Sequence, residues 1–220
     1  MNKKIVSFFT TMFLISVTFF SFEGTLVSAD QTVSTTPTST LNFNVTVAVT
    51  SELSLTCPSS VSMSSISGLT GGSSLSTADC NVKSNDANGY VLYIKASSTP
   101  ALVSVASTSV YFDDYRTSTP EYTWTNASAS SSFGISVSST NAVSAFRSSA
   151  SVCGGGPTAA SYTACFRSLS TNNITLASAS SATVSNGVTT TIGFKAEVGA
   201  TRNQPTGTYT AGITVTAFNQ

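Results

Sequence analysis

A stretch of alternating side chains at residues 41–57 constrains the fold more than any other part of the chain. Apolar residues occupy its odd positions, with a break at Ser51-Glu52. Successive side chains of a strand point to opposite faces, so the odd positions share one apolar face. At about 3.3 Å per residue the stretch would span roughly 55 Å, longer than an ordinary strand. We therefore expect two collinear strands, with the apolar residues Leu41, Phe43, Val45, Val47 and Val49 in the first and Leu53, Leu55 and Cys57 in the second.

The composition indicates many short strands. The 220 residues are 40% hydrophobic and only 8% charged, with a formal net charge of zero. Abundant Val, Thr, Tyr and Phe broken by Gly, Asn and Ser favour strands over disorder. The charge balance gives no reason to expect nucleic acid or acidic lipid as a partner. We predict an all-β, Ig-like (Greek-key) antiparallel β-sandwich of about eight to ten strands, forming one domain over residues 41–220.

The N-terminus has the pattern of a secretory signal over residues 1–29. Lys3 and Lys4 precede an apolar run at 5–20, and small residues at 27–29 suit cleavage. The alternative is an uncleaved membrane anchor, for which the run is short. Residues 30–40 form a polar arm that we expect to be flexible. The predicted product is secreted to the cell surface and touches a membrane only through its export signal.

The four cysteines are expected to form disulfides in an oxidising compartment, where three connectivities are open. Pairing between sequence neighbours suggests Cys57–Cys80 and Cys153–Cys165, and the second pair would pin a surface loop. A metal site is the alternative. The chain has no histidine and no Cys-x-x-Cys motif, so we predict no metal and no cofactor.

Further strands follow from local patterns. Asn88-Gly89 predicts a hairpin turn, and the nearly continuous apolar run at 90–96 predicts a central strand. Alternation is clear again at 188–198 and 207–218. Weaker candidates lie at 78–82, 101–106, 109–112, 131–139, 142–147 and 173–177.

Catalytic patterns are missing from the sequence. Without histidine there is no Ser-His-Asp triad. Asp113 and Asp114 are adjacent and would point to opposite faces of a strand, so they cannot form a catalytic pair alone. Asp86 or Glu121 could complete such a pair only in space. Aspartates at 79, 86, 113 and 114 could bind calcium, but the chain has no spaced Asp-x-Asp-x-Asp-Gly loop. We predict a non-enzymatic protein.

Three motifs carry a family resemblance: NGYVLYI at 88–94, SSFGISV at 131–137 and QPTGTYTAGITVTA at 204–217. They resemble segments of small secreted bacterial β-sandwich proteins. The last is similar to the closing strand of spore coat protein U-type and other chaperone–usher-type pilin subunits, with Gly207 at the matching glycine. Asn219 stands where those subunits carry an aromatic residue.

The resemblance implies a mechanism. In such subunits an alternating N-terminal extension fills the groove of the next subunit as a donor strand, a role that would fall to Leu41–Val49. Their first disulfide corresponds to Cys57–Cys80. The partner would then be a second copy or another surface protein, and the product a pilus-like filament.

Two other hypotheses remain open at this point. Leu41–Val49 could pair in cis as the edge strand of a monomeric secreted sandwich. Alternatively, the protein is an adhesin or carbohydrate-binding module, in which aromatic residues of one loop region stack on glycans. The candidate residues for that surface are Tyr111, Tyr115, Tyr122 and Trp124.

Overall fold

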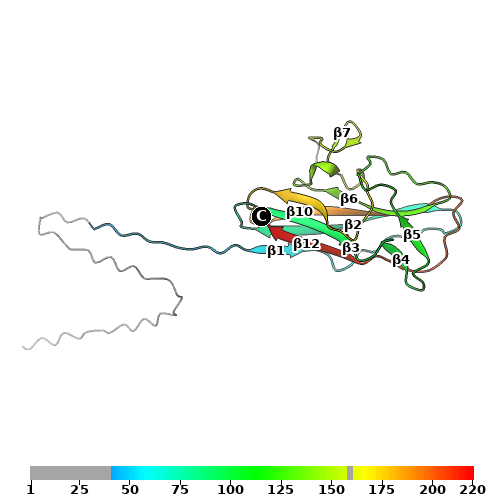
Figure 1. Cartoon of the computed structure of the whole chain (residues 1–220), viewed down its shortest axis with the longest axis horizontal. Helices are drawn as coiled ribbons and strands as arrows, with labels where there is room; N and C mark the ends of the chain where they lie inside the picture. Colours follow the sequence, from blue (N-terminus) through cyan, green and yellow to red (C-terminus); the bar gives the residue numbers. More distant parts are fainter. Residues whose placement is uncertain (1–40, 158–160) are drawn as a thin grey trace, which may run out of the picture. The chain divides into compact units, whose positions relative to one another are not determined.

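A computed structural model describes residues 41–157 and 161–220 (Figure 1). The expected signal at 1–29 and the polar arm at 30–40 lie outside the described residues. Residues 49–220 form one compact unit, separate from the residues before it. In the described part of the chain this unit contains twelve strands and one 3-10 helix, η1 (Ser144–Phe146), so the fold is all-β.

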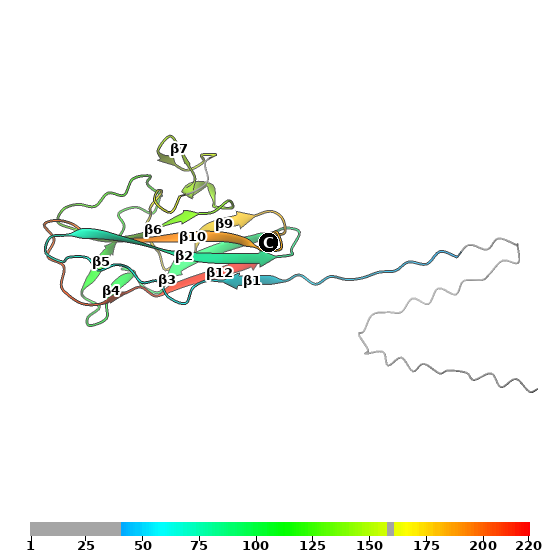
Figure 2. The same cartoon turned by 180° about the vertical axis from the view of Figure 1, so that it is seen from behind.

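The strands form two main sheets and one small hairpin. The larger sheet runs in the spatial order β1 (Leu53–Thr56), β2 (Gly72–Ser84), β10 (Val188–Val198), β6 (Ser131–Ser138), β5 (Tyr111–Asp114), β4 (Leu102–Ser104), β11 (Tyr209–Thr210). The smaller sheet has the order β12 (Ile213–Asn219), β3 (Tyr90–Ala96), β9 (Ile174–Ala179). The hairpin consists of β7 (Ser148–Ser149) and β8 (Val152–Cys153) and stands apart from both sheets (Figures 1 and 2).

One hydrophobic core lies between the two main sheets. The smaller sheet contributes the alternate residues Tyr90, Leu92 and Ile94 of β3, all fully buried. The larger sheet contributes the matching sets Phe133, Ile135 and Val137 from β6 and Ile192, Phe194 and Ala196 from β10. The predicted central strand at 90–96 is confirmed, because β3 pairs with β12 on one side and β9 on the other. Two sheets around a shared core fit a β-sandwich.

The predicted hairpin at Asn88-Gly89 is wrong. The chain does turn there, with Gly89 at a φ of 85° and its N–H donating to the carbonyl oxygen of Asp86 at 3.0 Å. However, β2 already pairs with β1 and β10, so it has no free edge for β3. The turn therefore carries the chain from the larger sheet to the smaller one.

Two further expectations need correction. The strands are not all antiparallel, because β5 and β6 pair in parallel. Residues 115–130 connect them, and a parallel pair requires a long crossover of this kind. The weak strand expected at 142–147 is instead a single bridge from Ala142 to Ala177, followed by η1.

The closing segment changes sheets midway. The sequence predicts one alternating strand over 207–218, but the structure divides it into β11, which pairs with β4, and β12, which pairs with β3. The break falls at Ala211–Gly212, where the carbonyl oxygen of Gly212 accepts the N–H of Ser97 at 2.8 Å. A Cβ at Gly212 would collide with the Ser97 hydroxyl. Alternation alone cannot show such a switch, since both strands keep the same parity.

The crossing turn at Gly89 provides a stability test. A Cβ there would collide with the carbonyl of Ala179, and its positive φ also strains an L-residue. Gly154 has a positive φ too, but open space surrounds its Cβ position. We expect Gly89→Ala to lower the free energy of unfolding by about 2 kcal/mol or more, and Gly154→Ala by about 1 kcal/mol or less. Urea denaturation measures both; equal losses would contradict the packing argument.

Candidate strand-addition interface

The apolar residues of the 41–49 stretch are exposed. Residues 41–52 belong to no strand within the described chain, so the first of the two predicted collinear strands is not formed, whereas the second is present as β1. An isolated strand has no partner for its backbone hydrogen bonds and is not stable in water. The exposed fractions are 53% for Leu41, 84% for Phe43, 85% for Val45, 83% for Val47 and 82% for Val49.

Hydrogen bonds hold the break at Ser51-Glu52 between the two predicted strands. The side chain of Asn85 accepts the N–H of Glu52 at 2.7 Å and donates to the carbonyl oxygen of Thr50 at 2.9 Å. The N–H of Asn85 also donates to the carbonyl oxygen of Glu52 at 3.3 Å. These bonds continue the β1–β2 ladder, whose last pair is Leu53 with Ser84.

Two more side chains hold Ser51. Its hydroxyl donates to Asp86 Oδ2 at 3.0 Å and accepts from Asn219 Nδ2 at 2.8 Å. The N–H of Asn88 and the Ser51 hydroxyl both donate to the Asp86 carboxylate, and these bonds lower its pKa. We call Asn85, Asp86 and Asn219 the polar clamp. It keeps residues 50–52 extended at the break between the two predicted strands.

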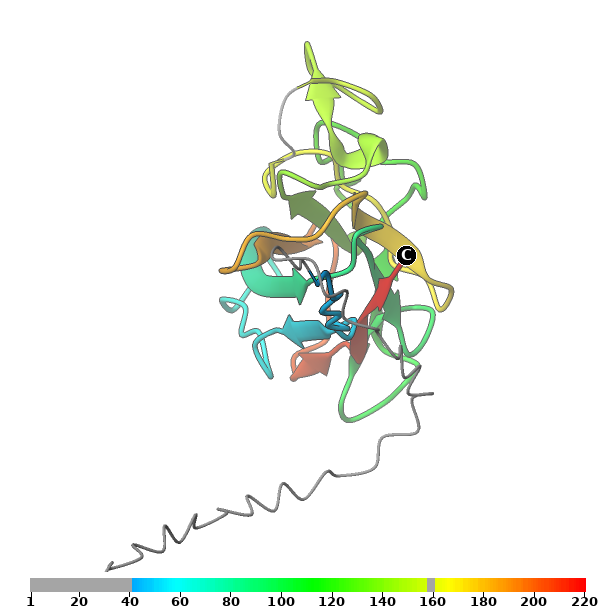
Figure 3. The same cartoon turned by 90° about the vertical axis from the view of Figure 1, so that its left-hand side faces the viewer.

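The strands β1 and β12 each have one unpaired edge. β1 pairs only with β2, and β12 pairs only with β3. The two strands lie side by side, as Figure 3 shows for the blue β1 and the red β12. Within the described residues, however, no backbone ladder joins them. We call this open side of the two-sheet body the β1–β12 edge.

The core is incompletely covered at the β1–β12 edge. Inward-facing residues of the neighbouring strands β2 and β3, such as Val82 and Leu92, are fully buried. The corresponding side chains at the edge pack against the same core but are only half-buried. They are Leu53 and Leu55 of β1, Cys57 just after it, and Ile213, Val215 and Ala217 of β12. The edge thus offers both unpaired backbone groups and partly exposed apolar side chains.

Both disulfides suggested by sequence neighbours are present in the structure. Cys57–Cys80 links the end of β1 to β2, with a Cα–Cα distance of 4.3 Å, and so anchors the short edge strand. Cys153–Cys165 links β8 to a segment close to β6. Two residues after Cys165, Arg167 forms a β-bridge with Ile135 of β6. Two disulfides suggest an oxidising, extracellular environment.

The four aromatic candidates do not form one surface. Tyr115 is buried and stacks on Trp124 at 4.3 Å between ring centroids, and Trp124 packs edge-on against Phe166 at 5.2 Å. A Cβ at Gly134 on β6 would collide with the carbonyl oxygen of Arg167 and the Cβ of Tyr115 and would crowd the Trp124 ring. Lys195 Nζ lies 4.9 Å from the Trp124 ring centroid, and burial lowers its pKa.

The other two aromatic candidates lie in different surroundings. Tyr122 is half-buried against the core. Tyr111 is more exposed and lines a cavity together with Asp113 and Arg202. Of the four, Tyr111 lines this cavity.

In the part of the chain that the structure describes, the candidate carboxylates make separate contacts. Asp79 accepts the Thr191 hydroxyl at 2.6 Å, and Asp86 belongs to the polar clamp. Asp114 accepts the N–H of Ala101 at 2.9 Å, and burial raises its pKa. Within residues 41–157 and 161–220 no three His, Cys, Asp or Glu side chains lie together in a way that could hold a metal. The same residues include no helix long and apolar enough to cross a bilayer.

No protein-family model, curated protein or solved structure matches the chain. The resemblance to pilin subunits therefore rests on the three sequence motifs alone.

Sequence reasoning missed the polar clamp. Asn85 and Asp86 fall in a turn segment, where such residues are common for local reasons. Asn219 appeared only as a departure from the expected aromatic residue. Its amide joins Ser51 to Ser84, whose hydroxyl donates to Asn219 Oδ1 at 2.7 Å. No signal in the sequence connects positions 51, 85 and 219.

Acidification should loosen the polar clamp. The folded-state pKa of Asp86 lies below its unfolded value, so its bonds stabilise the fold above the unfolded pKa and are lost as the pH falls through the folded one. We expect the NMR signals of Ser51 to change in that acidic range and the change to vanish in Asp86→Asn. A Ser51 transition at or above the ordinary aspartate pKa would contradict the assigned bond.

Proposed function

We propose that this protein is a non-enzymatic structural subunit of the extracellular surface that assembles by β-strand addition. Residues 41–49 of one copy would join the β1–β12 edge of the next. Backbone hydrogen bonds would complete the edge, and the odd-numbered side chains would cover the half-buried core residues.

One observation carries this proposal: the chain contains both an exposed strand-length apolar alternation and, in β1 and β12, edge strands that are unpaired on one side. The length of the 41–49 stretch matches the length of the edge. At about 3.3 Å per residue, residues 41–49 span roughly 30 Å when extended, enough to follow the roughly 23 Å of β12. The five apolar side chains match an edge whose inward residues are apolar and incompletely covered.

The polar clamp favours addition to another copy. To pair beside its own β1, the chain would need a tight reversal near residues 50–52. Asn85 instead binds both Thr50 and Glu52 in an extended arrangement. A head-to-tail contact between copies that does not close on itself produces a filament.

We also propose that the β-sandwich has an Ig-like Greek-key topology. An Ig-like Greek-key sandwich of the spore coat protein U or pilin type is supported by two sheets around one core and by Cys57–Cys80 at the first strand. The closing alternation in β12 also supports it. Export and placement on the cell surface agree with the disulfides.

Charge substitutions on the two faces of the 41–49 stretch test the mechanism. Val45→Asp and Val47→Asp would place a carboxylate among apolar core residues, at a cost of several kcal/mol. Assembly should weaken by more than about a hundredfold. Asn44→Asp and Thr46→Asp carry the same charge on the opposite face and should assemble almost normally. Sedimentation and electron microscopy of the four variants provide the measurement.

Comparing the variants on the apolar face with those on the polar face distinguishes burial of the side chain from a general effect of added charge. Equal loss of assembly in all four variants would indicate repulsion rather than burial. Unchanged assembly in Val45→Asp and Val47→Asp would remove residues 41–49 from the interface.

A further inference from the structure

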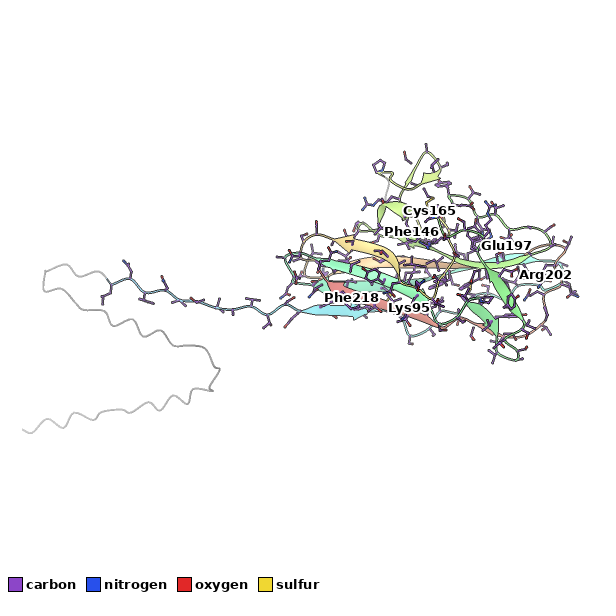
Figure 4. All side chains as sticks on the ribbon, viewed as in Figure 1. Lys95, Phe146, Cys165, Glu197, Arg202 and Phe218 are labelled. Carbon is purple, nitrogen blue, oxygen red and sulfur yellow. A yellow bond between two sulfur atoms is a disulfide. The ribbon has the colours of Figure 1, made fainter. Side chains whose placement is uncertain are left out.

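A cavity of about 300 Å³ lies beside β5, away from the β1–β12 edge. It is near the end of the body at which Figure 4 labels Arg202, whereas Phe218 of β12 is labelled towards the other end. Its lining comes from the loop before β5, from β5 itself and from the loop after β10: Ser109, Val110, Tyr111, Asp113, Arg202 and Pro205. None of these residues belongs to β1 or β12.

Hydrogen bonds fix the walls of this cavity. The buried amide of Gln204 donates to the carbonyl oxygen of Tyr111 at 3.1 Å and to the hydroxyl of Tyr209 at 3.0 Å. The Tyr209 hydroxyl donates in turn to the carbonyl oxygen of Pro205 at 2.6 Å. The two loops are thereby joined before any ligand arrives, and a preformed site loses less conformational entropy on binding.

The cavity presents two opposite charges. Asp113 and Arg202 both line it, yet the ion pairs in the described part of the chain are Arg116–Glu121 and Lys195–Glu197. Arg202 Nε makes one long bond, of 3.4 Å, to Gln204 Oε1. A carboxylate supplies acceptors only and a guanidinium donors only. Together they suit a neutral ligand that carries both donors and acceptors close to each other.

Tyr111 adds an apolar surface beside these charges. Tyr111 is 37% exposed as a residue. An aromatic ring can cover the C–H face of a ligand while its hydroxyl stays in water. A pyranose ring combines hydroxyl groups with such a C–H face. The volume lies at the lower end for small-molecule sites, which favours one ring.

We propose that this cavity binds one neutral pyranose residue of a glycan. Asp113 accepts from its hydroxyl groups, Arg202 donates to them, and Tyr111 packs against its apolar face. The site gives the protein an adhesive activity that does not depend on strand addition.

A glycan array of neutral and acidic sugars, probed with the intact protein, is the first step. Titration calorimetry with the smallest neutral sugar that binds then compares Asp113→Asn, Arg202→Gln and Tyr111→Ala with the unaltered protein. We expect each to weaken binding at least about tenfold, the usual effect of losing a charged hydrogen bond or a stacked ring. Tyr162→Ala is the matched control, because Tyr162 is 39% exposed but lies outside the cavity.

The outcomes separate clearly. Binding of neutral glycans that is lost in the three cavity variants and kept in Tyr162→Ala supports the proposal. Failure of the unaltered protein to bind any neutral sugar, or equal binding by Asp113→Asn and Arg202→Gln, would overturn it. Thermal unfolding checks that the variants are folded. Filament assembly should be unchanged in Asp113→Asn, so the two proposals can fail independently.

Discussion

Backbone hydrogen bonding at the β1–β12 edge is the constraint on which this account depends. Buried N–H and C=O groups of a strand need partners, and an exposed sheet edge can pair with another strand. Here the open edge coincides with the half-buried side of the core, where Leu55 and Val215 remain partly exposed. A strand added to β1 or to β12 would give its unpaired backbone groups partners and cover part of its half-buried side chains.

The chain itself carries a segment suited to that role. The odd residues of 41–49 are among its most exposed large apolar side chains, an unfavourable arrangement for a protein that remains alone in water. The polar clamp holds the adjoining residues extended through Asn85 and Asp86. The cavity at Asp113 and Arg202 lies elsewhere, so the proposed assembly and the proposed ligand binding would use different surfaces.

Sequence reasoning predicted what depends on local periodicity. The all-β class, β3 as a central strand, β10 and both disulfides follow from alternation and cysteine order. It failed where tertiary context decides. The turn at Gly89 looks the same whether it joins paired strands or crosses between sheets, and the break at Gly212 leaves parity unchanged. The polar clamp and the cavity join residues far apart in sequence, such as Ser51 with Asn219 and Tyr111 with Arg202.

The most direct test compares residues 30–220 with residues 50–220, both produced in an oxidising compartment, by size-exclusion chromatography and electron microscopy. If residues 41–49 act as a donor strand, the longer chain polymerises and the shorter one stays folded and monomeric. A longer chain that remains a stable monomer and unfolds when truncated would contradict the account, because residues 41–49 would then belong to their own core.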